Sequence, residues 1–194
     1  MGWHRWLFIK ILQEKRRLGF NACYRIYFSF TKQKDSIWIG TNNGLFRITV
    51  LKNQLYLKEF ISKISISTLS INDNTLWIAG IDEQLKNKVR IWQYTLKSHQ
   101  LQIININTQL PIVSILSYKS KILFLTGYSG FASINYPRNH KNNIIVIYDI
   151  KTKVIQYLQF KSKLETINCA ILLDHKLLIG GMGGLESFIL PLQH

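Results

Sequence analysis

A chain of 194 residues is long enough for one compact domain, and its 47% apolar content excludes a disordered protein. The 25 basic residues outnumber the 10 acidic residues and give a net charge of +15, which favours acidic or polyanionic partners. Only seven basic residues are arginine, and the chain is also rich in Ile, Asn, Tyr and Phe. An AT-rich coding bias is therefore the competing source of the many lysines.

The first apolar segment, residues 5–12 (RWLFIKIL), is interrupted by Lys10. It is too short to span a membrane, and no small-residue cleavage site follows it, so we expect neither an export signal nor a membrane span. The two cysteines, Cys23 and Cys169, lie far apart in the sequence and form no disulfide or metal-ligand pattern. We expect both to be reduced and buried in inner strands, in a protein of the cytoplasm.

The N-terminal part of the chain is strongly basic. Residues 1–34 hold +7 of the net charge, and Lys15, Arg16 and Arg17 follow one another directly. Such a cluster can attract an anionic partner, and nucleic acid is one candidate. The alternative interpretation is a solvated connection between two strands.

From residue 36 onward the sequence repeats. The segments SIWIGTNNGL, TLWIAGIDEQ, KILFLTGYSG and KLLIGGMGGL each contain a strand-like apolar run that ends in a glycine, at positions 40, 80, 127 and 180. The spacings of 40, 47 and 53 residues are typical of propellers and solenoids. In the last three repeats another apolar run precedes the glycine-ended run, and a short polar turn joins the two, at Asp73-Asn74, Lys119-Ser120 and Asp174-His175. A third run follows each of the four glycine-ended runs, and a fourth run follows in three repeats. Four antiparallel strands per repeat form the blade of a β-propeller.

The sequence therefore predicts an all-β fold, a single propeller domain over residues 1–194. The predicted blades span residues 22–60, 64–107, 112–160 and 166–190. The last blade lacks its outer strand, and we expect residues 5–12 to complete it and so close a ring of four blades. The alternative is a larger ring, completed by further sequence or by a partner chain in an oligomer.

Two propeller families share motifs with this chain. The stretch WIGTNNGLFR, residues 38–47, resembles the repeat of the sensor propellers of bacterial two-component regulators. More weakly, VRIWQYTL and IIVIYDIKT are similar to the third strand of WD40 repeats, with Gln93 where that family prefers Asp, and Asp149 in the expected place. The sensor resemblance implies a propeller that binds a small molecule within a long, exported receptor. Since none of those attachments is visible in the sequence, we carry over the fold and not the signalling role.

An insertion at residues 127–143, between the second and third strands of the third blade, is the main candidate binding segment. Aromatic rings beside basic groups can pack against an acidic peptide or stack on nucleic-acid bases. The corresponding loop of the second blade, residues 81–88, is also long, and both loops belong to the same face of a propeller. The alternative is a variable solvated loop. The predicted partner-binding residues are Tyr128, Phe131, Tyr136, Arg138, His140 and Lys141.

The sequence contains no recognisable motif for catalysis, cofactor binding or metal binding. The five histidines, at positions 4, 99, 140, 175 and 194, lack any paired spacing for a metal, and no G-x-S-x-G is present. The glycine-rich stretch 180–184 (GGMGG) has no following Lys-Ser or Lys-Thr, so it predicts a tight turn and not a phosphate loop. We therefore predict no catalytic, cofactor or metal residues, and a non-enzymatic scaffold that recognises a protein partner. A small-molecule sensor and a polyanion-binding module are the two alternatives.

Overall fold

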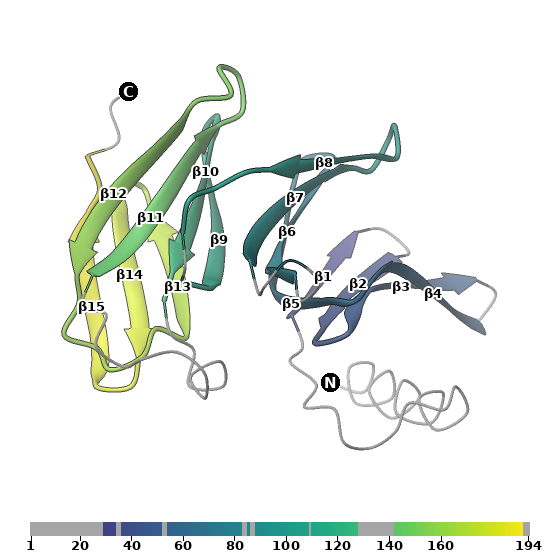
Figure 1. The fold of residues 1–194 in the computed structure, drawn as a ribbon, viewed down its shortest axis with the longest axis horizontal. Coiled ribbons are helices and arrows are strands. Elements are labelled where there is room, and N and C mark those ends of the chain that lie inside the picture. The colour runs from purple at the N-terminus through teal and green to yellow at the C-terminus, as the bar shows by residue number, and fades with distance from the viewer. Residues whose placement is uncertain are drawn as a thin grey trace.

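The computed structural model describes residues 29–33, 36–51, 54–82, 85, 88–108, 110–127 and 142–191. The described residues form strands arranged in four antiparallel sheets (Figure 1). Sheet 1 contains β1 (Ser29–Gln33), β2 (Ser36–Thr41), β3 (Gly44–Leu51) and β4 (Gln54–Ser62). Sheet 2 contains β5 (Ile64–Asn72), β6 (Thr75–Asp82), β7 (Lys88–Thr95) and β8 (Gln100–Ile104). Sheet 3 contains β9 (Ile112–Tyr118), β10 (Lys121–Thr126), β11 (Asn142–Asp149) and β12 (Ile155–Lys161). Sheet 4 contains β13 (Cys169–Leu173), β14 (Lys176–Gly181) and β15 (Gly184–Ile189).

The predicted fold class is confirmed. In every sheet the strands follow one another in chain order as an antiparallel meander, which is the blade of a propeller. In the described part, β1 begins at Ser29, whereas the predicted first blade begins at residue 22; residues 22–28 and the predicted closing strand 5–12 lie outside the described residues. The same part of the chain holds no long apolar helix of the kind that crosses a bilayer.

The sheets stack face to face in chain order. Because side chains alternate along a strand, each sheet has a preceding face, which points to the sheet before it, and a following face, which points to the sheet after it. Residues of neighbouring sheets form three buried clusters, so each contact between sheets is made by apolar side chains. In each cluster, following-face residues of one sheet join preceding-face residues of the next: Trp38 with Ile78, Trp77 with Phe124, and Leu125 with Ile179 share a cluster.

Two tryptophans hold equivalent positions in the first two stacking contacts. Trp38 of β2 meets the ring of Tyr94 edge-on at a centroid distance of 5.7 Å. Trp77 of β6 meets Phe124 at 5.8 Å and Tyr148 at 5.7 Å, again edge-on. Edge-to-face ring pairs stabilise the fold beyond the stability gained by burying the rings. The Trp that marks the repeat in the sequence thus joins one blade to the next.

The turns agree with the residues that were expected to make them. The first residue of each turn that joins strands one and two of sheets 2, 3 and 4 has a positive φ: +50° at Asp73, +51° at Lys119 and +54° at Asp174. The glycine-rich stretch makes the β14–β15 turn at Met182 and Gly183, as predicted.

One expectation about the cysteines is wrong. Cys169 lies in the first strand of sheet 4, as expected, but its thiol is exposed and free. The reason is that Cys169 is on the following face of sheet 4, which none of the four described sheets covers. Cys23 lies outside the described residues.

Candidate interaction surface

The turns of the sheets gather at two ends, which we call the loop end and the hairpin end. The loop end carries the connections between second and third strands together with the links between sheets. Three backbone hydrogen bonds join these segments: Lys63 N–H to Asn43 O at 3.2 Å, Gly127 N–H to Pro111 O at 3.0 Å, and Glu165 N–H to Met182 O at 3.0 Å. The second-to-third-strand loops and the inter-blade links therefore lie at one end, as the sequence predicted.

The third sheet holds the base of the predicted binding insertion in place. The buried hydroxyl of Thr126 donates to the carbonyl oxygen of Ile144 at 2.9 Å and accepts the N–H of the same residue at 2.8 Å. Asn143 is only 7% exposed. The insertion thus leaves β10 and rejoins β11 at defined points of the loop end. The six predicted partner-binding residues lie outside the described residues: Tyr128, Phe131, Tyr136, Arg138, His140 and Lys141.

The corresponding loop of sheet 2 is also held at its base. Asp82, the last residue of β6, pairs with Lys88, the first residue of β7. An ion pair joins the carboxylate of Asp82 to Nε of Arg90 at 3.5 Å, and both side chains are mostly buried. Leu85, within this loop, is 46% exposed. An apolar side chain on a loop whose base is fixed is a common feature of binding surfaces.

The hairpin end carries the turns between strands one and two and between strands three and four, and its described charges are mainly basic. Lys97, Lys119, Lys151, Lys153 and Lys176 are exposed there, whereas the exposed acidic residues are Asp73 and Asp174. Two ammonium groups lie over aromatic rings: Lys119 over Tyr118 at 5.4 Å and Lys153 over Tyr148 at 5.7 Å. Sequence reasoning missed this cluster, although lysines recur beside the predicted turns. The predicted anion-binding residues Lys15, Arg16 and Arg17 lie outside the described residues.

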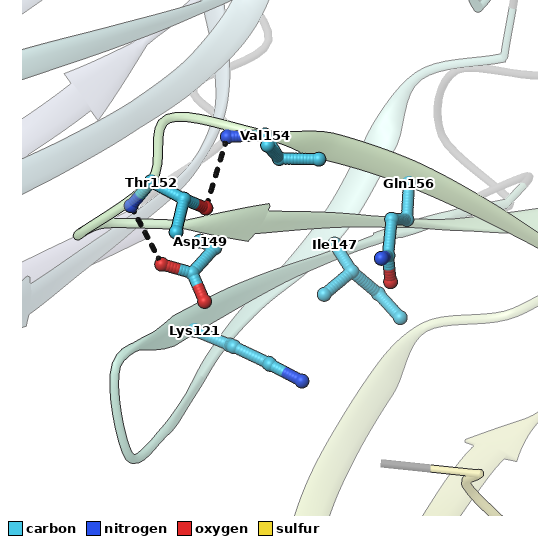
Figure 2. Close-up of a pocket in the computed structure, with 6 residues that line it drawn as sticks. All are labelled: Lys121, Ile147, Asp149, Thr152, Val154 and Gln156. Carbon is cyan, nitrogen blue, oxygen red and sulfur yellow. Dashed lines mark hydrogen bonds between the residues drawn. The ribbon is translucent and has the colours of Figure 1, made fainter. Parts of the chain in front are cut away.

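A small hollow of ≈ 180 Å³ opens beside the β11–β12 hairpin (Figure 2). Sites for small organic ligands usually have volumes of about 300–1,000 Å³, so the hollow fits an ion or a single functional group better than a whole ligand. Figure 2 shows that polar side chains from neighbouring strands of sheet 3 meet here. The lining residues are Lys121, Ile147, Asp149, Thr152, Val154 and Gln156.

Asp149 organises the hairpin that borders this hollow. Its Oδ1 accepts the backbone N–H groups of Lys151 at 2.9 Å and Thr152 at 3.0 Å. The pKa of Asp149 lies below its usual value, and the hydrogen bond from the Thr152 backbone is the largest cause. Partial desolvation raises the pKa and opposes this effect, whereas the positive charge of Lys121 lowers it slightly further. The position matches the Asp expected from the WD40 resemblance, and its role here is to stabilise a turn.

We expect the pH to control the stability of this hairpin. Because the pKa of Asp149 is lowered in the folded state, its stabilising effect is present above the ordinary carboxyl pKa of about 4 and is lost as the pH falls through the lowered value. Protection factors compare each observed hydrogen-exchange rate with the intrinsic rate at the same pH; those of the Lys151 and Thr152 amides should therefore fall in acid, and D149A should lower them at neutral pH. The variant D149N keeps an acceptor oxygen and should keep similar protection factors at both pH values. Equal exchange rates in D149A and the wild type would contradict this role.

Histidines are found at two described turns. His99 Nδ1 lies 2.8 Å from the hydroxyl of Tyr94, and burial raises the pKa of that tyrosine while the charge of Arg47 opposes the change. His175 lies in the β13–β14 turn. Within the described ranges, no group of three or more His, Cys, Asp or Glu side chains is close enough together to hold a metal ion.

Comparisons with known proteins bear on the fold. No family model and no curated protein sequence matches the chain. The computationally designed Ika4 protein is 13% identical, with a TM-score of 0.54 over 87% of this chain and 94% of that one. The computationally designed Ika8 protein is 13% identical, with a TM-score of 0.56 over 87% of this chain, which spans about half (47%) of Ika8. The extracellular domain of the putative one component system BT4673 from B. thetaiotaomicron is 17% identical, covers 90% of this chain and 34% of that one, and has a TM-score of only 0.37. These similarities concern the fold alone.

Proposed function

We propose that this chain is a non-enzymatic interaction module that binds a protein partner at its loop end. The observation that carries the proposal is the placement of two long second-to-third-strand loops at one end, each with a fixed base. Thr126 and Ile144 hold one loop through two hydrogen bonds, and the Asp82–Arg90 ion pair holds the other. A rigid scaffold that presents variable loops loses little conformational entropy on binding.

The composition of the loops indicates the chemistry of the partner. Residues 127–143 contain aromatic and basic side chains and no acidic one, and the whole chain carries a net charge of +15. A partner with exposed acidic residues around an apolar patch would match both features. The cytoplasmic location expected from the sequence stays a prediction.

A polyanion-binding role is the second candidate, and the lysines of the hairpin end favour it. Lys119, Lys151 and Lys153 lie close together on the turns of sheet 3, where a backbone hydrogen bond joins Ile150 to Ser120 at 2.8 Å. Neutralising phosphates with lysines gives a binding constant that falls steeply with salt. A small-molecule sensor has less support, because the hollow beside Asp149 is smaller than most ligand sites.

The test of the main proposal uses two matched variants. One replaces residues 129–140 by a Gly-Ser linker of the same length, and the other is the triple substitution K119E/K151E/K153E at the opposite end. We expect tagged wild type and triple variant to capture the same proteins in quantitative affinity purification, and the linker variant to lose them while keeping the wild-type melting temperature. Recovery of the same proteins by the linker variant would overturn binding at the loop end.

The second candidate is tested with a short fluorescent single-stranded DNA as the probe. Polyanion binding at the hairpin end predicts an affinity that falls with salt and is lost in the triple variant, with the linker variant unchanged. Equal binding by the wild type and the triple variant would contradict it.

A further inference from the structure

The contact between sheets 1 and 2 contains an arginine whose charge has no partner. The guanidinium of Arg47, on β3, lies over the indole ring of Trp38, with Cζ 5.7 Å from the ring centroid. Its Nε is buried and donates to no described residue, and no carboxylate of those residues forms an ion pair with it. Arg90, the other arginine of the described residues, is paired with Asp82. Because taking a charge out of water is costly, a partly buried guanidinium calls for a nearby anion.

A second donor beside Arg47 is also unsatisfied. Trp38 is 1% exposed, and its Nε1 has no hydrogen-bond partner among the described residues. The two residues lie opposite each other on β2 and β3, so two unpartnered N–H donors are neighbours. The repeat does not itself require a charge at this place, since the residue opposite Trp77 in sheet 2 is Gln93. Arg47 therefore has a role that the stacking of the sheets leaves unexplained.

Further polar groups face the same place. Lys58 of β4 lies opposite Arg47 on the same face of sheet 1, and it is exposed. From sheet 2, the hydroxyl of Tyr94 is near enough to be affected by the charge of Arg47, and it lies 2.8 Å from His99 Nδ1. Glu59 lies opposite Phe46 and so points to the other face of sheet 1. The groups that meet here are thus cations and hydrogen-bond donors.

We propose that Arg47, Lys58 and Tyr94 form a binding site for a phosphate group between sheets 1 and 2. A guanidinium donates two parallel N–H bonds to phosphate oxygens, and the ammonium of Lys58 supplies a second positive charge. The Tyr94 hydroxyl can donate to a third oxygen when His99 Nδ1 donates to that hydroxyl. A tetrahedral anion suits donors that come from β3, β4 and β7, whereas a carboxylate has only two oxygens, in one plane. This site goes beyond the proposed partner binding at the loop end.

The test is a titration of the isotope-labelled full chain with inorganic phosphate at physiological salt, at which charges more than about 8 Å apart are largely screened. Two-dimensional NMR detects the Nε–H group of Arg47 and the Nε1–H group of each tryptophan separately. We expect the Arg47 and Trp38 signals to shift together and to saturate with a Kd of ~1 mM, which is typical of two charge-assisted hydrogen bonds. The signal of Trp77 is the internal control and should not move, because Gln93 lies opposite it in place of an arginine.

Three single substitutions separate the site from the overall positive charge. R47K keeps the charge but loses the planar pair of donors, so it should weaken phosphate binding about 10-fold. K58Q removes one exposed charge and should weaken binding about 3-fold. The matched control is K176Q, which removes one exposed charge from β14 in sheet 4 and should bind phosphate like the wild type. If R47K does not fold, K58Q and K176Q decide the question between them.

A second pair of probes identifies the source of the phosphate. Acetate should bind at least about 10-fold more weakly than phosphate, because it carries less charge and fewer oxygens. A phosphoserine peptide with neutral flanking residues should bind more tightly than phosphate if the ligand is a phosphorylated protein, and equally if it is a small phosphorylated compound; either result supports the site. No saturable shift, equal binding of acetate, or unchanged affinity in K58Q would overturn the proposal. The substitutions leave the loop end unchanged, so this proposal and the proposed function fail independently.

Discussion

Replacing Gly44 by alanine should lower the free energy of unfolding by ~3 kcal/mol or more. Gly44 begins β3 with a φ of +145°, a region that only glycine adopts without strain. A Cβ at this position would also collide with the backbone carbonyl oxygen of Ile61 in β4. Because the obstacle is backbone in a paired strand, it cannot turn aside as a side chain would. Chemical denaturation of G44A followed by tryptophan fluorescence measures the loss.

Gly184 supplies a matched control from the fourth repeat. It precedes Leu185 as Gly44 precedes Leu45, and its φ is +126°, but no atom of the described residues lies within 4 Å of the position its Cβ would take. The variant G184A should therefore show only the conformational cost, about 1–2 kcal/mol. The difference between the variants measures the crowding by β4. A loss as large as that of G44A would mean that a fourth strand lies beside β15, which is the place predicted for residues 5–12.

Truncation of Trp77 to alanine should cost the chain ~3–5 kcal/mol of stability. The side chain is fully buried and packs edge-on against Phe124 and Tyr148 of the next sheet. Its removal opens a cavity at the contact between sheets 2 and 3, and both sheets lose packing. Unfolding should occur at a lower denaturant concentration, and hydrogen exchange should accelerate in β6 and β10 together.

The control for this prediction is W77F. Within the described part of the chain, Nε1 of Trp77 is buried without a hydrogen-bond partner, so phenylalanine removes no polar contact and keeps an aromatic ring against Phe124. We expect W77F to lose about half as much stability as W77A, or less. If W77A unfolded like the wild type, the contact between the two sheets would not be a source of stability.

The strands and turns could be predicted because they depend on short-range patterns. The repeats that contain Trp38 and Trp77, the glycines near the ends of the second strands, and the polar turns at Asp73 and Asp174 all occur where the sequence placed them. Alternation, turn chemistry and antiparallel pairing of neighbouring segments act within about 40 residues, which is the length of one repeat.

The candidate surfaces were harder to foresee. The sequence predicted that long second-to-third-strand loops share one end, and the links at Lys63 and Gly127 confirm that arrangement. It did not predict the lysines that gather at the hairpin end, because Lys119 and Lys153 lie more than 30 residues apart and meet only when the hairpins of sheet 3 align. The exposed thiol of Cys169 was missed for a similar reason.

The sequence by itself therefore determined the repeat: which residues form strands, where the chain turns, and which side chains share a face of a sheet. Only the tertiary structure decided which faces are covered. Leu45 and Leu185 both follow a glycine at the start of a third strand, yet one is 0% exposed and the other 70%. The physical reason is that alternation along a strand is a local property, whereas burial requires another sheet to pack against the face. Sheet 1 has such a neighbour in sheet 2, whereas no sheet of the described residues packs against the following face of sheet 4.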